Sequence, residues 1–130
     1  MSDEELLEQM ENEKGFFHHN HFHVIEANEN NIEVKAMLDE NSMNPYGIVH
    51  GGIIFGLGDT VMGMVAKSTG RKAITLDANI NYFYPGKGSF LTAKAEMLKN
   101  GHTTCHLRAY IYDEDNRLIA TMNSNYYYID

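Results

Sequence analysis

The pattern of apolar and polar positions singles out one segment near the middle of the chain. Over residues 51–67, apolar side chains occupy nearly every side of a helix. A helix that is apolar almost all round is buried, so we place this segment at the centre of the fold. Its apolar residues are Ile53, Ile54, Phe55, Leu57, Val61, Met62, Met64, Val65 and Ala66.

The second half of the chain alternates as β-strands do. A strand over 74–82 is predicted to carry Ile74, Leu76, Ala78, Ile80 and Tyr82 on one face and Thr75, Asp77, Asn79 and Asn81 on the other. Further strands are predicted over 90–99, 102–112 and 118–128, with turns at 85–88 and 113–116. These segments alone indicate an antiparallel sheet.

The first fifty residues predict a short amphipathic helix and two strands. The helix covers 2–12, with Ser2 as its N-cap and Gly15 as its end. A histidine-rich stretch, 18–23, leads into strands at 24–27 and 32–38 that are joined by a turn at 28–31. Residues 41–50 are predicted to form a loop. Strands, one long buried helix and more antiparallel strands together predict an α+β fold in which a sheet wraps one helix.

Length and composition indicate a single domain, residues 1–130, because 130 residues and 43% hydrophobic content suit one ordinary core. The net charge of -8 argues against nucleic acid and, more weakly, against anionic membranes as partners. No apolar run approaches the ~20 residues of a membrane-spanning helix. The acidic N-terminus lacks a signal-peptide layout, and the single cysteine, Cys105, fits a reducing compartment. We therefore expect a cytoplasmic protein.

The residues that suggest chemistry lie at the start and in the middle of the buried helix. Gly51 and Gly52 leave backbone N–H groups unshielded at a helix N-terminus, which suits an anion or a developing oxyanion, although the same junction could be only a tight turn. Asp59 lies inside the apolar helix, where an unpaired carboxylate is costly and aspartate is a poor helix former. This indicates a functional carboxylate; the alternative is a carboxylate that only fixes packing.

The spacing of these groups limits how they can act together. Gly52 and Asp59 project within ~20° of one helix face but lie ~10 Å apart along the axis. A general base must lie within hydrogen-bond reach of its proton. If Asp59 and the Gly51–Gly52 junction act on one carbonyl, a second chain has to supply one of them. A symmetric dimer with two shared sites follows as a hypothesis.

The pattern Asn-x-x-Gly-x-x-His-Gly-Gly at 44–52, with aspartate seven residues after the second glycine, strongly resembles the hotdog-fold acyl-CoA thioesterases of the phenylacetate-degradation (PaaI) type. The stretches Ile-Thr-Leu-Asp-Ala-Asn-Ile-Asn-Tyr at 74–82 and Tyr-Pro-Gly at 84–86 resemble that family's next strand and turn. The likeness covers about residue 41 to the C-terminus. It implies an antiparallel sheet wrapped around one long central helix, joined to a second sheet in a homodimer and commonly in a homotetramer.

The resemblance also implies roles for individual residues. The Gly51 N–H would polarise the thioester carbonyl, and Asp59 of the facing subunit would act as general base or nucleophile. Asn44 and His50 would line the site, and the Thr75 hydroxyl would assist near the carboxylate. The substrate would be an acyl-CoA, cleaved to free acid and CoA without a metal or other cofactor. The residues that we expect to contact the substrate are Gly52, Phe55, Met62, Asn79, Tyr84 and Lys87.

Several other features admit a plainer interpretation. His50 could be a general base or only an orienting hydrogen-bond partner. His19, His21 and His23 alternate as metal ligands on one strand would, but no acidic or cysteine partner is obvious nearby, so we expect exposed histidines and no metal. Cys105 is predicted to be a core residue. The tyrosines at 126–128 are predicted to cover the sheet or an interface.

Two other functions compete with thioester hydrolysis. A hotdog enoyl-CoA hydratase typically shows Asp-x-Asn-Pro-x-His or His-Phe-Pro-Gly, whereas the spacing from Asn44 to His50 fits the thioesterases. A non-catalytic acyl-CoA-binding module would keep the cleft and lose the carboxylate, which is present as Asp59. The sequence does not name the acyl group, although the aromatic and methionine side chains near the helix suit aromatic or medium-chain acyl groups.

Overall fold

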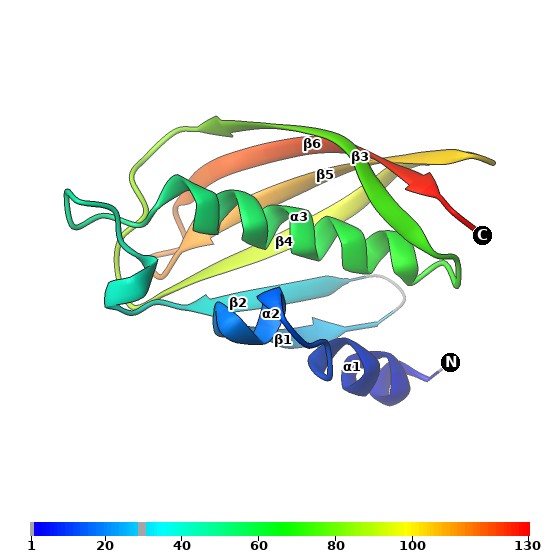
Figure 1. Cartoon of the computed structure of the whole chain (residues 1–130), viewed down its shortest axis with the longest axis horizontal. Helices are drawn as coiled ribbons and strands as arrows, with labels where there is room; N and C mark the ends of the chain where they lie inside the picture. Colours follow the sequence, from blue (N-terminus) through cyan, green and yellow to red (C-terminus); the bar gives the residue numbers. More distant parts are fainter. Residues whose placement is uncertain (1, 29–30) are drawn as a thin grey trace.

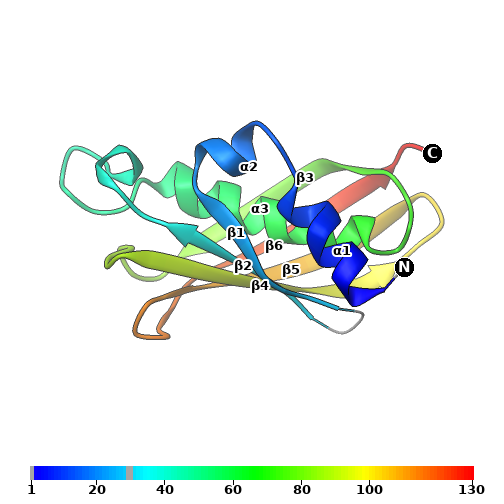
Figure 2. The same cartoon turned by 90° about the horizontal axis from the view of Figure 1, so that it is seen from below.

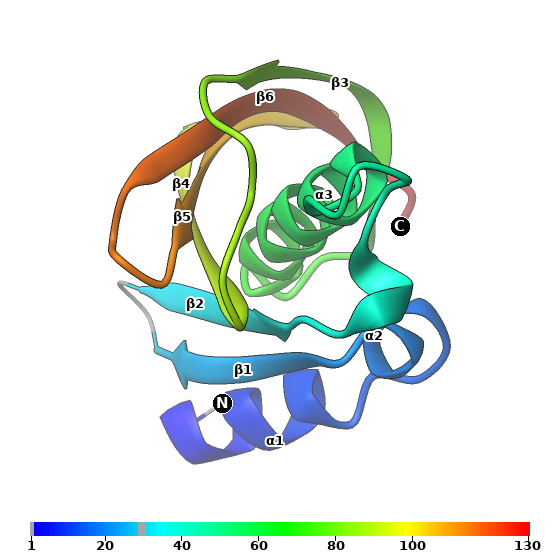
Figure 3. The ribbon, with the colours of Figure 1, turned by 90° about the vertical axis from the view of Figure 1, so that its left-hand side faces the viewer.

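The structure, a computed structural model, describes residues 2–28 and 31–130. In this part of the chain six antiparallel strands form one sheet in the order β1-β2-β4-β5-β6-β3. The sheet curls around helix α3, which lies along its concave face (Figure 1; Figure 3). A sheet wrapped around one helix, as predicted from the sequence, is confirmed. The strands are β1 Phe22–Ala27, β2 Ile32–Met37, β3 Ala73–Tyr82, β4 Phe90–Asn100, β5 Thr104–Asp113 and β6 Leu118–Tyr128.

The central helix α3 spans Gly51–Lys67, the range that the sequence predicts. One side of it is fully buried against the sheet, where Leu57 and Val61 meet core residues such as Leu107 and Ile111. Elsewhere on α3 the burial is less complete: Gly52 is exposed, and Asp59 is half-buried. Burial of the apolar side therefore fixes α3 in place and leaves Asp59 partly accessible.

The N-terminal segment packs on the outer side of the sheet's first strand (Figure 2; Figure 3). Helix α1, Asp3–Glu11, is capped by Ser2, whose Oγ accepts from the Glu5 N–H at 3.1 Å. The helix ends at Glu11 with Asn12 as its C-cap, within one residue of the predicted range 2–12, and before Gly15, which was predicted to end it. Gly15 has a φ of +74° and instead precedes a second short helix, α2 Phe16–His19, which the sequence pattern does not predict.

The histidine-rich stretch is divided among different elements, so its histidines do not share a strand face. His19 ends α2, His21 follows it with a φ of 58°, and His23 lies in β1. Among the described residues no group of three or more His, Cys, Asp or Glu side chains is placed to hold a metal ion. Residues 29 and 30 of the turn predicted at 28–31 lie outside the described residues. Residue 1 also lies outside them.

A β-bulge interrupts the alternation of β3 between Thr75 and Asp77. Asp77, Asn79 and Asn81 lie on the face away from α3, as predicted. Thr75 pairs with the buried Tyr126 and therefore faces the helix, whereas the sequence pattern places it with Asp77. The predicted face of Thr75 is wrong because Leu76 is the extra residue of the bulge and shifts the alternation by one position.

The loop before α3 contains a short 3-10 helix, η1 Glu40–Ser42, and an isolated bridge between Met43 and Val49. The rest of the stretch predicted as a loop has no regular structure. In the described part of the chain, the helices are too short or too polar to cross a membrane.

Candidate active site

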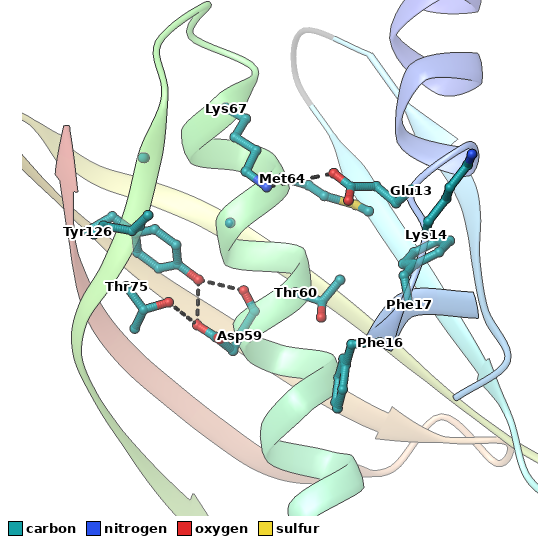
Figure 4. A pocket seen from close by; sticks show the side chains of 13 residues that line it. Glu13, Lys14, Phe16, Phe17, Asp59, Thr60, Met64, Lys67, Thr75 and Tyr126 are labelled. Carbon is teal, nitrogen blue, oxygen red and sulfur yellow. Dashed lines mark hydrogen bonds and ion pairs between the residues drawn. The ribbon is translucent and has the colours of Figure 1, made fainter. Parts of the chain in front are cut away.

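Asp59 is held by side chains from two different strands (Figure 4). Thr75 of β3 donates its hydroxyl to Asp59 Oδ1 at 2.8 Å. The phenol oxygen of Tyr126 in β6 lies 2.5 Å from the same Oδ1 and 2.5 Å from the backbone carbonyl oxygen of Asp59. Among the described residues, no donor contacts Asp59 Oδ2. The carboxylate is thus fixed through one oxygen only.

The Tyr126 phenol remains a donor because its pKa is raised well above the usual value for tyrosine. Burial is the main cause, and the neighbouring Asp59 carboxylate adds to it. Only 3% of Tyr126 is exposed. Across the ordinary pH range the phenol therefore keeps its proton and offers it to Asp59.

A pocket of about 310 Å³ opens beside Asp59, and the N-terminal segment forms one wall of it. Phe16, Phe17 and Met64 supply apolar surface, and Glu13 pairs with Lys67 of α3 at 3.6 Å across the same pocket (Figure 4). None of the N-terminal wall residues was predicted as a site residue. The paired phenylalanines after Gly15 were a visible apolar signal, but nothing in their spacing indicates contact with Asp59.

A second pocket, of about 500 Å³, lies at the N-terminus of α3. Gly51, Gly52, Asn44 and Tyr84 line it, so four predicted site residues are brought together there. No acceptor for the Gly51 N–H is found among the described residues. The Tyr82 hydroxyl donates to the Gly51 carbonyl at 2.7 Å, which holds the helix start against β3.

His50 and Asn44 organise the backbone around this helix start. His50 is the N-cap of α3, and its Nδ1 accepts the Gly52 N–H at 2.8 Å. The neutral ring therefore carries its proton on Nε2, which favours an orienting role over that of a general base. Asn44 Oδ1 accepts from the N–H groups of Tyr46 and Ile48, at 2.9 and 3.3 Å, so the amide shapes the loop.

None of the four remaining predicted substrate contacts lines either of these two pockets. Met62 is fully buried and accepts a hydrogen bond from Ser124 through Sδ at 3.2 Å, so it is a core residue and not a pocket wall. Asn79 lies on the sheet face away from α3, opposite Asn123. Phe55, which is half-buried, and Lys87, which is exposed next to Gly86, line neither pocket.

The two pockets have no lining residue in common. Gly51 and Asp59 are eight residues apart on one helix, which corresponds to about 12 Å along its axis. One pocket offers a fixed carboxylate that can accept a proton or attack a carbonyl. The other offers a free N–H at the positive end of a helix dipole, which suits an oxygen that becomes anionic.

Comparison with known proteins adds a family and several relatives. Residues 46–120 match the family model described as "Thioesterase superfamily". The Bacillus subtilis protein named "Putative esterase ComA2" is 33% identical over 103 residues, which cover 74% of this chain and 82% of the relative.

Solved structures agree with the fold described above. The Escherichia coli PaaI protein from the phenylacetic acid degradation operon superposes with a TM-score of 0.90 at 21% identity, covering 98% of this chain and 94% of that one, so both share the hotdog fold. A hypothetical thioesterase from Streptococcus pneumoniae, solved with coenzyme A, has a TM-score of 0.78 at 30% identity, covering 82% and 84% of the two chains. Two further structures of that protein each carry one alanine substitution. One replaces an aspartate, and the other replaces a threonine sixteen positions later.

Proposed function

The chain belongs to the thioesterase superfamily, and on that premise we propose that it hydrolyses an acyl-CoA to a free acid and CoA, with Asp59 as the reacting carboxylate. One observation carries the proposal. Two hydroxyl donors hold Asp59 Oδ1 at the wall of an open pocket, and Oδ2 has no donor among the described residues. A carboxylate that only fixed packing would not need an unpaired oxygen beside a pocket.

Relatives support both the carboxylate and the substrate class. The aspartate and threonine that were replaced in the Streptococcus pneumoniae protein are sixteen positions apart. Asp59 and Thr75 have the same spacing, and they are hydrogen-bonded to each other. That relative was solved with coenzyme A, which supports a CoA thioester as substrate here.

As a general base, Asp59 would accept a proton from water while the water oxygen bonds to the thioester carbon. The carbonyl oxygen becomes anionic and is stabilised by the Gly51 N–H. When the carbonyl re-forms, the carbon–sulfur bond breaks. The CoA thiolate leaves and takes up a proton, and the acyl group leaves as a carboxylic acid.

As a nucleophile, Asp59 Oδ2 would itself bond to the thioester carbon and expel the CoA thiolate. Water would then cleave the resulting mixed anhydride. Single-turnover hydrolysis in ¹⁸O-labelled water separates the two routes. Label in the Asp59 carboxylate after one turnover indicates nucleophilic attack followed by addition of water to the aspartyl carbonyl. Label in the free acid alone indicates a general base only if no acyl-aspartyl anhydride can be captured, because water could also add to the acyl carbonyl of an anhydride.

We further propose that each site combines Asp59 of one subunit with the Gly51 N–H of a second. Two observations support a homodimer: the two groups line separate pockets of the chain, and β3 forms an edge of the sheet with Ile74 and Leu76 more than half exposed. An unpaired edge strand of ten residues is a template for pairing with another chain. Light scattering coupled to size-exclusion chromatography tests this, and a fully active monomer would contradict it.

The acyl group is proposed to occupy the pocket beside Asp59. Phe16, Phe17 and Met64 provide apolar surface there, while the pair of Glu13 and Lys67 bounds it. An apolar wall with a small volume suits aromatic or medium-chain acyl groups.

The test is release of CoA from a panel of short-chain, medium-chain, long-chain and arylacyl-CoAs by the wild type and Asp59→Asn. We expect kcat to fall by about 10²- to 10⁴-fold in the variant, the usual contribution of a positioned base. Asp77→Asn is the matched control, because this exposed carboxylate of the same region bonds only to Asn125 among the described residues. Saturable binding of acyl-CoA with no CoA release by the wild type would indicate a non-catalytic binding module instead.

A further inference from the structure

Tyr126 is the closest side chain to Asp59, yet neither the sequence pattern nor the comparisons assign it a role. Its phenol oxygen lies 2.5 Å from Asp59 Oδ1, nearer than the Thr75 hydroxyl at 2.8 Å. Both hydroxyls therefore meet the same carboxylate oxygen. A carboxylate oxygen has two lone-pair sites, so two donors fill the hydrogen-bonding capacity of Oδ1.

We infer that Tyr126 is a positioning residue for Asp59: together with Thr75 it occupies Oδ1 and leaves Oδ2 as the single oxygen that can meet water or the thioester. This inference rests on the proposed function, in which Asp59 is the reacting group. Selecting one oxygen restricts the rotation of the carboxylate, which keeps the reacting atom in one orientation.

The fold holds Tyr126 in place from three sides. In the sheet it pairs with Thr75 of β3 and with Cys105 of β5. On the helix side it packs over Gly63, where a Cβ would lie 3.4 Å from the tyrosine ring. A Cβ there would be in ordinary van der Waals contact with the ring, so the tyrosine lies directly against α3 beside Asp59.

The same phenol oxygen also lies 2.5 Å from the backbone carbonyl oxygen of Asp59. The tyrosine thus contacts both the side chain and the main chain of one residue, one helical turn from Gly63. The phenol has a single proton, which the two acceptor oxygens share. The tyrosine therefore holds the carboxylate next to the backbone of its own residue.

No charged or titratable neighbour of Asp59 takes the place of its two hydroxyl donors among the described residues. Glu13, Lys14 and Lys67 line the same pocket, and the Cys105 thiol lies opposite Tyr126 in the sheet. None of them donates a hydrogen bond to the carboxylate among the described residues. Thr75 and Tyr126 are thus the two side-chain donors to the carboxylate among the described residues, and removing either should misplace the reacting oxygen.

The experiment compares Tyr126→Phe with Tyr128→Phe. Tyr128 is a matched control because it lies in the same strand, is also 3% exposed, and donates its phenol to Asn100 at 2.6 Å instead of to Asp59. We expect Tyr126→Phe to lower kcat on the order of 10-fold or more, with a smaller change in KM, since misplacement of a reacting group affects the chemical step. Thr75→Val should show the same split between kcat and KM, and Tyr128→Phe should leave both unchanged.

Thermal unfolding of both tyrosine variants separates positioning from stability. Equal losses of Tm with a loss of kcat in Tyr126→Phe alone support the inference. An unchanged kcat in Tyr126→Phe, or the same loss of kcat in Tyr128→Phe, would overturn it. Asp59→Asn keeps the two proposals apart: if that variant is inactive while Tyr126→Phe behaves as wild type, only the positioning role fails, whereas an active Asp59→Asn enzyme removes the proposed function itself.

Discussion

Gly51 offers a way to remove a single backbone N–H while keeping the helix that carries it. It is the first residue of α3, where proline is well tolerated because the N–H has no intrahelical partner. His50 before it has φ -61° and ψ 132°, an extended conformation that a following proline accepts. Proline at this position would therefore delete the proposed oxyanion donor with little change in the fold.

We expect Gly51→Pro to lower kcat by about 10²- to 10³-fold, the usual effect of losing one oxyanion donor. Gly51→Ala is the control, because it keeps the N–H and adds the same Cβ, which would lie 3.2 Å from the Tyr82 hydroxyl oxygen. CoA release by the two variants is the measurement. Similar losses in both would attribute the effect to crowding at Tyr82 and would exclude the N–H as the donor.

Asp59 and its two partners differ in how far the sequence could predict them. A carboxylate within an apolar helix is visible in the sequence, because burial makes it costly. Thr75 was reached only through the family resemblance, since simple alternation puts it on the wrong face of β3. Tyr126 was predicted only to cover the sheet or an interface. Its contact with Asp59 depends on strand register and on the packing of β6 against α3, neither of which is a local property of the sequence.

At the level of elements, the glycines of α3 explain how a helix can pack so closely inside a curled sheet. A Cβ on Gly58 would collide with Met122 Sδ and lie 3.2 Å from Ile111 Cδ1, both fully buried. A Cβ on Gly56 would lie 2.6 Å from Cζ of Phe16, a side chain that is 55% exposed. The first contact is with the core, and the second is with a ring that has space to move.

Alanine substitutions at these two positions should therefore act in different directions. Gly58→Ala is expected to lower the free energy of unfolding by about 1–3 kcal/mol, as overpacking of a tight core usually does. Gly56→Ala is expected to be nearly neutral or stabilising, because alanine is favoured over glycine in a helix by about 1 kcal/mol. Urea unfolding of both variants checks this, and equal destabilisation would show that Phe16 is as constrained as Met122.

The β-bulge limits how well the facing of side chains in β3 can be predicted from the sequence. Alternation correctly separates Ala78, Ile80 and Tyr82 from Asp77, Asn79 and Asn81. It fails for Thr75 because the extra residue of a bulge cannot be located from alternation alone. The bounds of α3 were predictable because a helix that is apolar nearly all round and begins at the Gly51–Gly52 pair has few alternative placements.

At the level of the whole molecule, the least distinctive part of the sequence forms a wall of the candidate site. The first forty residues contribute little to the family resemblance, yet Glu13, Phe16 and Phe17 line the Asp59 pocket. Their place depends on how α1 and α2 pack against β1 and α3. The amphipathic helix was predictable from its apolar stripe, but the surface it covers was not, because that surface is assembled from distant segments.

The assembly of the site from two subunits can be tested with heterodimers that carry different tags and are purified by both. In a shared-site dimer, a subunit with Asp59→Asn and a partner with Gly51→Pro form one site with both changes and one site with neither. Such a heterodimer should have about half of the wild-type activity, although each homodimer is nearly inactive. If each chain used its own Asp59 and Gly51, every site in this heterodimer would carry one change and activity would be lost.

The reciprocal heterodimer is expected to give the opposite result. It therefore distinguishes a shared site from a general loss of activity in the altered subunits. One subunit carries both Asp59→Asn and Gly51→Pro, and its partner is wild type. With shared sites, each site then contains one altered group, and little activity should remain. With sites built from one chain, the wild-type subunit would keep its own site, and about half of the activity would persist. The two heterodimers contain the same four groups in different combinations, so their relative activity depends only on which chain supplies each group to a site.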